Sequence, residues 1–160
     1  MTSLIYQLPD SLGLLELSES VLAHFEANKQ RNRMSCEAGG QLFAQIDNPG
    51  KRIKVVDATG PRSTDRRSIF GYVPDRVAER EEIFDSYSRG LHFVGDWHTH
   101  RQLQPLPSAT DNASMREMVM QSAHDLSGFI MVIVGQACFP GGLCVSFHSK
   151  AMSHQLVLVN

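Results

Sequence analysis

The alternation of apolar and polar positions predicts a helix and then a β-hairpin in the first third of the chain. Apolar residues recur at helical spacing around Ser18, a residue suited to cap a helix, and the pattern fades into the polar stretch 28–33. These apolar positions are Leu17, Val21, Leu22 and Phe25. Two strand-like segments, residues 40–46 and 52–58, then flank Asp47-Asn48-Pro49-Gly50, whose composition is typical of a turn.

The middle of the chain alternates irregular and periodic segments. Residues 60–74 contain glycine, proline and arginine without sustained periodicity, so we expect a long loop there. Residues 75–89 are expected to form a second helix that Gly90 ends, and residues 91–97 follow as a strand. The apolar stripe expected to bury this helix comprises Val77, Ile83, Phe84 and Tyr87.

The last part of the chain predicts a third helix and further strands. Residues 108–123 have a helix start signal and no breaker, and the apolar run 129–134 is typical of a strand buried on both faces. Residues 143–147 and 155–159 are expected to add two strands, the second at an edge. The predicted fold class is therefore α/β (α+β), a mixed β-sheet flanked by about three helices. We expect residues 1–160 to form a single domain.

Composition narrows the function classes. Apolar residues make up 42% and charged residues 20% of the chain, which is typical of globular domains. A net charge of -2 gives no general attraction to nucleic acid, so no nucleic-acid partner is expected. Three cysteines suit free thiols in a reducing compartment, and no apolar run reaches the ~20 residues of a spanning helix. We therefore expect a cytoplasmic protein without a membrane partner.

The strongest chemical signal is His98-Thr99-His100, followed by Asp111 after a proline-containing connection. Histidines at alternate strand positions point to one face, about 7 Å apart along the strand. A catalytic zinc site combines three such nitrogen or oxygen ligands with one water. We expect His98, His100 and Asp111 to hold one zinc ion, which would lower the pKa of that water and polarise a carbonyl.

Two further residues complete a hydrolytic mechanism. Glu37 stands before a strand in Glu37-Ala38-Gly39-Gly40, where the glycines let the backbone run close to other groups, so its carboxylate is the predicted proton acceptor. Ser108 follows Pro107 near the expected ligand Asp111. Its hydroxyl is the predicted donor to the oxyanion, a role that contributes about 3–4 kcal/mol to lowering a barrier.

Each of these residues also has a structural interpretation. Ser108 and Asp111 together have the spacing of a helix start, with Ser108 as the cap and Asp111 near the positive end of the helix dipole. Glu37 alone would be a surface carboxylate, and a histidine pair can arise by chance. Asp111 discriminates between the alternatives, because an oxygen lone pair given to zinc is not available to a backbone amide.

Other reactive residue types are expected to be structural. Cys36 is interpreted as a buried, inert thiol and Trp97 as a core or site-wall residue, and the methionines near Met115 are expected to pack their helix. Cys138 and Cys144 are expected to pack within their hairpin. The histidines without a shared ligand spacing are His24, His92, His124, His148 and His154.

Glu37 with Gly39-Gly40-x-Leu42, His98-x-His100 and Ser108-x-x-Asp111 resembles the complete signature of the JAMM (JAB/MPN) metalloproteases. The resemblance fills most of the chain. It implies a JAB/MPN-like fold and a zinc hydrolase that cleaves the bond after the C terminus of a ubiquitin-like protein. It also implies that the loop 60–74 helps to grip the substrate tail by strand addition, where its arginines can meet acidic residues.

The segments 95–100 and 105–108 resemble the short bacterial JAMM proteins of CBASS anti-phage operons. That resemblance implies cleavage of a conjugated cyclic-oligonucleotide synthase at its C-terminal tail, in opposition to a ubiquitin-transfer-like conjugating enzyme. Arg101 stands where proline is common in these proteins, and Ala44 where glycine is common. Two alternatives remain at this point: a noncatalytic MPN scaffold or tail-binding module, and a protease that trims a ubiquitin-like sulfur-carrier precursor.

Overall fold

The computed structural model describes residues 2–47, 49, 51–122 and 125–160. Its order of elements is β1 (Leu4–Gln7), β2 (Leu14–Leu17), α1 (Glu19–Asn28), β3 (Gly39–Asp47), β4 (Arg52–Ala58), β5 (Arg66–Ser68), β6 (Gly71–Val73), α2 (Arg76–Ser88), β7 (His92–Thr99), α3 (Ala109–Gln121), β8 (Phe129–Val134), β9 (Leu143–His148), β10 (Ser153–Gln155) and β11 (Val157–Leu158). The expectations for Asn48, Gly50, Ala123 and His124 lie outside the described residues.

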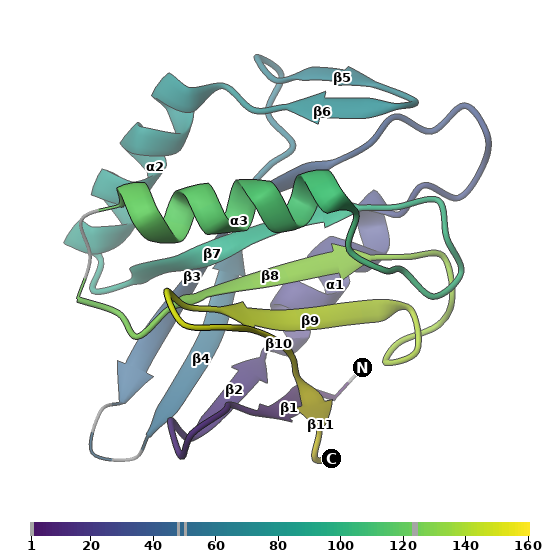
Figure 1. Ribbon diagram of the computed structural model, residues 1–160. Coiled ribbons are helices and arrows are strands. Elements are labelled where there is room, and N and C mark those ends of the chain that lie inside the picture. Colours follow the sequence, from purple (N-terminus) through teal and green to yellow (C-terminus); the bar gives the residue numbers. More distant parts are fainter. Residues whose placement is uncertain (1, 48, 50, 123–124) are drawn as a thin grey trace.

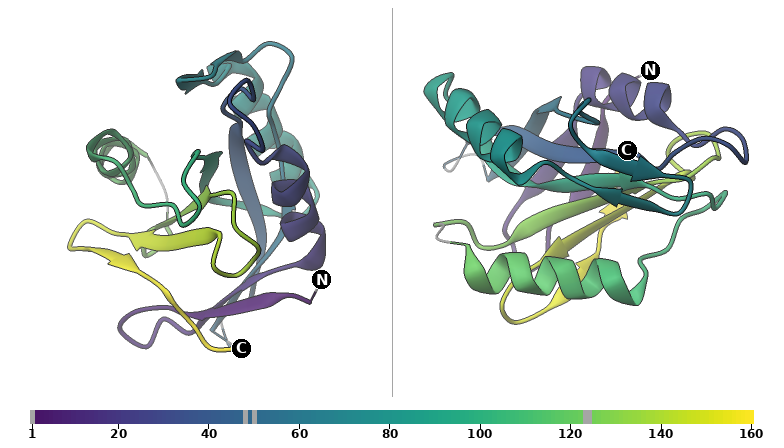
Figure 2. Two further views of the ribbon diagram at one scale, coloured as in Figure 1. Left: turned by 90° about the vertical axis from the view of Figure 1, so that its right-hand side faces the viewer. Right: turned by 90° about the horizontal axis from the view of Figure 1, so that it is seen from above.

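A nine-stranded mixed sheet forms the centre of the molecule, in the order β10-β9-β8-β7-β3-β4-β2-β1-β11 (Figure 1). The pairs β2–β4 and β7–β8 are parallel, and the other neighbours are antiparallel. α1 and α3 lie on opposite sides of this sheet (Figure 2). The predicted mixed sheet with flanking helices is confirmed.

The two faces of β8 contribute to two different apolar clusters. Ile130, Val132 and Val134 belong to a large apolar cluster that includes Phe25 of α1. The intervening residues of the same strand pack against Met115 of α3 in a second cluster. All six residues of β8 are buried, which confirms a central strand covered on both faces.

The β3–β4 hairpin, the α1 helix and its Ser18 cap are confirmed, since the Ser18 side chain accepts a hydrogen bond from the Val21 amide. Leu17, which the helical pattern included, does not belong to α1, however. Leu17 is buried in β2, which pairs in parallel with β4. β1 and β2 were not predicted, because four-residue strands depend on partners that are distant in the sequence.

The α2 helix buries a face other than the predicted one. Val77 and Phe84 are exposed, the latter by 82%, whereas Glu79 and Ser86 are buried. Arg62 explains this reversal, because its guanidinium pairs with Glu82 under the helix and approaches Glu79 within 4.0 Å. α2 is therefore held to the rest of the molecule largely by buried charged groups.

The predicted loop 60–74 contains a short hairpin. β5 and β6 form a separate two-stranded sheet beside the end of β7 (Figure 1). Three exposed residues form β5, so no alternation of apolar and polar positions marked it in the sequence. This hairpin forms one wall of the candidate site.

Candidate metal centre

The end of β7 presents two histidine rings to the same side. Thr99, between them, is buried and points the other way, where its hydroxyl donates to Gln30 Oε1 at 3.1 Å. His98 and His100 are half-buried, and their Nε2 atoms lie 3.2 Å apart. The buried threonine thus fixes the strand end that aims both imidazoles at one point.

Asp111 reaches the same point from the first turn of α3. Its Oδ1 lies 3.1 Å from His98 Nε2, and its Oδ2 lies 3.4 Å from His100 Nε2. Ser108 caps this helix: the Ser108 amide donates to Asp111 Oδ2 at 2.7 Å, and the Asp111 amide donates to Ser108 Oγ at 3.1 Å. The cap uses Oδ2, whereas Oδ1 is turned to the His98 ring. Asp111 can therefore cap α3 through Oδ2 and still turn Oδ1 toward the histidines.

The side chains of His98, His100 and Asp111 lie close enough together to share one metal ion. In a tetrahedral site with bonds of 2.0–2.1 Å, neighbouring ligand atoms are about 3.3 Å apart. The two histidine Nε2 atoms, 3.2 Å apart, and the pair of His98 Nε2 with Asp111 Oδ1, 3.1 Å apart, are close to that spacing, while His100 Nε2 lies 3.4 Å from the other carboxylate oxygen, Oδ2. Within the described ranges, these three residues are the one group of at least three His, Cys, Asp or Glu side chains that can hold a metal. Two imidazole nitrogens and a carboxylate suit zinc.

Charge in this cluster is strongly organised. Burial opposes ionisation of Asp111, but hydrogen bonds from His100 and His98 outweigh it and hold the pKa of that carboxyl well below its usual range. The same hydrogen bond to Asp111 raises the pKa of His100. The carboxylate is thus ready to accept a cation at neutral pH.

Glu37 lines the same cavity as these three residues. Its backbone is held on both sides, because its amide donates to Ser68 O at 2.8 Å and its carbonyl accepts from Arg67 Nε at 2.6 Å. The neighbouring Ala38 exchanges hydrogen bonds with Thr99, at 3.0 and 2.8 Å. Burial raises the pKa of Glu37, although positive charge on the two histidines would oppose that shift. A carboxylate with a raised pKa is suited to proton transfer.

Gly39, two residues beyond Glu37, sits where no side chain fits. A Cβ atom there would lie 2.6 Å from the ring of Tyr72 and 2.8 Å from the carbonyl oxygen of Trp97. The close approach of β3 to β7 and to the hairpin therefore requires glycine, as the sequence indicated.

A groove leads away from the candidate metal centre between α2 and α3. The cavity at the centre measures about 490 Å³, and a second of about 470 Å³ continues it. The two share five lining residues: Arg76, Glu79, Asp96, Ser114 and Met115. Burial and the charge of Glu79 raise the pKa of Asp96 to about 7. Asp96 was not among the predicted site residues, although its alternate spacing with His98 and His100, along β7 and the residue after it, indicates the same face.

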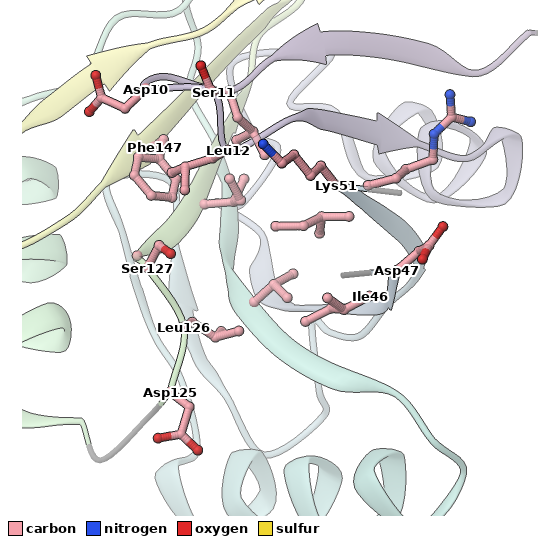
Figure 3. A pocket seen from close by; sticks show the side chains of 16 residues that line it. Asp10, Ser11, Leu12, Ile46, Asp47, Lys51, Asp125, Leu126, Ser127 and Phe147 are labelled. Atoms are coloured by element: carbon pink, nitrogen blue, oxygen red, sulfur yellow. The ribbon is translucent and has the colours of Figure 1, made fainter. Parts of the chain in front are cut away.

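Another cavity, of about 440 Å³, lies at the opposite ends of β7 and β8 (Figure 3). Charged side chains of Asp10, Lys51 and Asp125 surround it, and its apolar lining includes Ile46 and Phe147. It contains none of the three candidate metal ligands. The candidate chemistry therefore lies at the other end of the sheet.

Some expectations about neighbouring residues were wrong. Cys36 and Cys138 are exposed, whereas Cys144 is buried as expected. Arg62 is turned into the protein, where its ion pairs hold α2, so it does not present its charge to the groove.

Other expectations hold. Trp97 is buried and donates from its indole to Thr59 O at 2.9 Å, which confirms a core role. Met115 packs α3, although Met120 is exposed. Along the described part of the chain, no helix is long and apolar enough to cross a membrane.

Comparison with known proteins agrees with this geometry. The family described as prokaryotic homologs of the JAB domain matches residues 19–148. A Pseudomonas aeruginosa protein named CD-NTase/cGAS isopeptidase is 30% identical over 132 residues, covering 79% of this chain and 80% of the relative. A Vibrio cholerae protein of the same name is 26% identical, with 79% of each chain covered.

A solved structure supports the fold. The solution structure of a Desulfitobacterium hafniense protein covers 87% of both chains with a TM-score of 0.60 at 18% identity. The match over residues 19–148 includes the two histidines, the aspartate, Glu37 and Ser108. The chain therefore belongs to the JAMM (JAB/MPN) family, among the prokaryotic homologs of the JAB domain.

Proposed function

We propose that this protein is a zinc-dependent isopeptidase that removes a conjugated protein by cutting the bond after its C-terminal residue. The observation that carries the proposal is the convergence of His98, His100 and Asp111 at one end of a groove, where the two histidine Nε2 atoms lie 3.2 Å apart and each is 3.1–3.4 Å from an oxygen of Asp111. Family membership supports a metal-dependent hydrolase. We assign one zinc ion to these three ligands.

Glu37 and Ser108 are proposed as the catalytic side chains. When bound, zinc would polarise the scissile carbonyl and acidify the attacking water. Glu37 takes a proton from that water and delivers it to the departing amine, which a carboxyl with a raised pKa does well. Ser108 donates its hydroxyl hydrogen to the oxyanion. Its oxygen already accepts the Asp111 amide, so the hydroxyl is held in place before substrate arrives.

The proposed substrate is the amide that joins the C terminus of a CD-NTase, a cyclic-oligonucleotide synthase, to a lysine or another amine. The relatives named CD-NTase/cGAS isopeptidase support this choice. The groove between α2 and α3 passes through two adjoining cavities, and Gly71 and Tyr72 of β6 line the one at the candidate metal centre. We propose that the tail adds to β6 as a strand. The protein would then oppose the ubiquitin-transfer-like enzyme that conjugates the synthase.

Cleavage of a fusion tests this function. The substrate carries the C-terminal tail of the operon's synthase ahead of a reporter protein, and it is incubated with the protein plus zinc, with a chelator and with Glu37→Ala. Cleavage that needs zinc and is lost in Glu37→Ala, while zinc is still bound, is the expected result. A protein that binds no zinc, or whose His98→Ala variant acts like the wild type in cells, would be a scaffold rather than this enzyme.

A further inference from the structure

The β5–β6 hairpin holds the backbone of Glu37 on both sides. The Glu37 amide donates to the carbonyl of Ser68 in β5, and Arg67 of the same strand donates to the Glu37 carbonyl. Both hydrogen-bonding groups of the Glu37 residue backbone are therefore satisfied by the hairpin. The position of the hairpin therefore sets the position of the Glu37 backbone, from which the side chain extends.

The turn of the hairpin is bound to the strand that carries the histidines. Arg101 follows His100 directly, and its Nη2 donates to Ile69 O at 2.9 Å. The guanidinium carbon lies 5.2 Å from the centre of the Phe70 ring, while 82% of Phe70 remains exposed. We name this contact of Arg101 with Ile69 and Phe70 the Arg101 clasp.

The hairpin depends on such contacts for its position. Two strands of three residues each are marginally stable by themselves. At its base the hairpin is fixed by Tyr72, whose hydroxyl donates to Asp65 at 3.3 Å and whose ring packs on Gly39. At its turn, the Arg101 clasp bridges to the end of β7. Opening the clasp would free the end of the hairpin that neighbours the Ser68 bond to Glu37.

We propose that Arg101 is a positioning residue: by clasping the hairpin turn, it holds Glu37 in register with His98, His100 and Asp111. This rests on the proposed function, because it assigns Glu37 the proton transfer. Arg101 acts through the hairpin and does not itself transfer a proton. A small displacement of a general base lowers turnover while leaving the metal ligands intact.

Amide exchange tests the clasp without any catalysis. In metal-free protein, hydrogen–deuterium exchange of the Glu37 amide reports directly on its bond to Ser68. Arg101→Ala is expected to speed that exchange on the order of tenfold, because a hydrogen bond to a charged group is lost. Arg33→Ala removes the same charge from an exposed position ahead of Glu37 and is expected to change nothing. Arg101→Lys, which keeps the charge without the planar fork, is expected to fall between.

Steady-state kinetics on the tail fusion supply the second measurement. Arg101→Ala is expected to lower kcat on the order of tenfold, with KM and bound zinc unchanged, and Arg101→Lys to recover part of the loss. The exchange rate of the Glu37 amide and kcat should change together across the variants. This correlation would not arise if Arg101 merely contributed charge to the site.

Three results would overturn the proposal. Unchanged exchange of the Glu37 amide in Arg101→Ala would exclude the clasp, whatever the activity. Faster exchange with undiminished kcat would show that Glu37 needs no positioning by the hairpin. A raised KM at constant kcat would make Arg101 a tail-binding residue instead. If the wild-type protein binds zinc but cuts no tail, the proposed function is wrong. The exchange of the Glu37 amide still shows whether the Arg101 clasp positions Glu37.

Discussion

Replacing Ser108 with alanine separates its role as the helix cap of α3 from its proposed role as the donor to the oxyanion. The change removes the acceptor of the Asp111 amide hydrogen bond, at 3.1 Å, and keeps the Ser108 backbone amide that donates to Asp111. Loss of a serine cap costs about 1 kcal/mol of stability. Loss of a preorganised oxyanion donor costs about 3–4 kcal/mol of barrier, or roughly a hundred- to thousandfold in kcat.

Ser18 offers the matched control. It caps α1 in the same way, through the Val21 amide, and α1 lies on the other side of the sheet from α3. Denaturant unfolding of the metal-free protein should show a similar small decrease in the free energy of unfolding for Ser18→Ala and Ser108→Ala. The single-turnover rate of cleavage should decrease only in Ser108→Ala, with zinc still bound. A fall of less than about tenfold would reduce Ser108 to a helix cap and refute its catalytic assignment.

Three further outcomes follow from the described contacts. Asp111→Asn keeps an oxygen for the Ser108 amide but loses the charge, so zinc affinity should fall by more than about a hundredfold in a chelator competition, and metal-free stability should fall as well, because His98 and His100 hold the carboxylate in its ionised form. Gly95→Ala should abolish soluble protein, because its Cβ would lie 1.8 Å from a β8 carbonyl, whereas Gly90→Ala, in open space, should cost only about 1 kcal/mol in denaturant unfolding. Burial lowers the pKa of His148, so its contribution to stability is present above its unfolded pKa of about 6.5 and is lost as pH falls below it. The stability difference between wild type and His148→Gln should therefore shrink on acidification, as measured by unfolding at several pH values.

The clustering of the candidate metal ligands could be predicted because their signal is local. His98 and His100 alternate on a strand, and the proline-containing connection returns the chain to a helix start at Ser108. The structure confirms that these elements meet, and it brings Asp111 within 3.4 Å of both rings. The zinc itself, the catalytic roles and the single-domain boundary stay predictions.

The features that the sequence pattern did not predict, the buried face of α2 and the β5–β6 hairpin, depend on contacts between distant segments. α2 has an apolar stripe that would suit burial, yet Phe84 is exposed because Arg62 and Glu79 form ion pairs beneath the helix. No local periodicity reveals which face a charged network will hold. The β5–β6 hairpin was equally hidden, since its strands are short and β5 is exposed throughout.

Local sequence patterns were enough to predict the mixed fold, the central strand β8, the caps of α1 and α3, and the residue types of the candidate metal centre. These features follow from periodicity and capping over a few neighbouring residues. The tertiary structure alone decided that Asp111 can both cap α3 and face the histidines, because the positions of its two oxygens depend on how α3 docks on the sheet. It also decided that Arg67 and Arg101 tie a hairpin to Glu37 and to the histidine strand, since those bonds join segments about 30 residues apart.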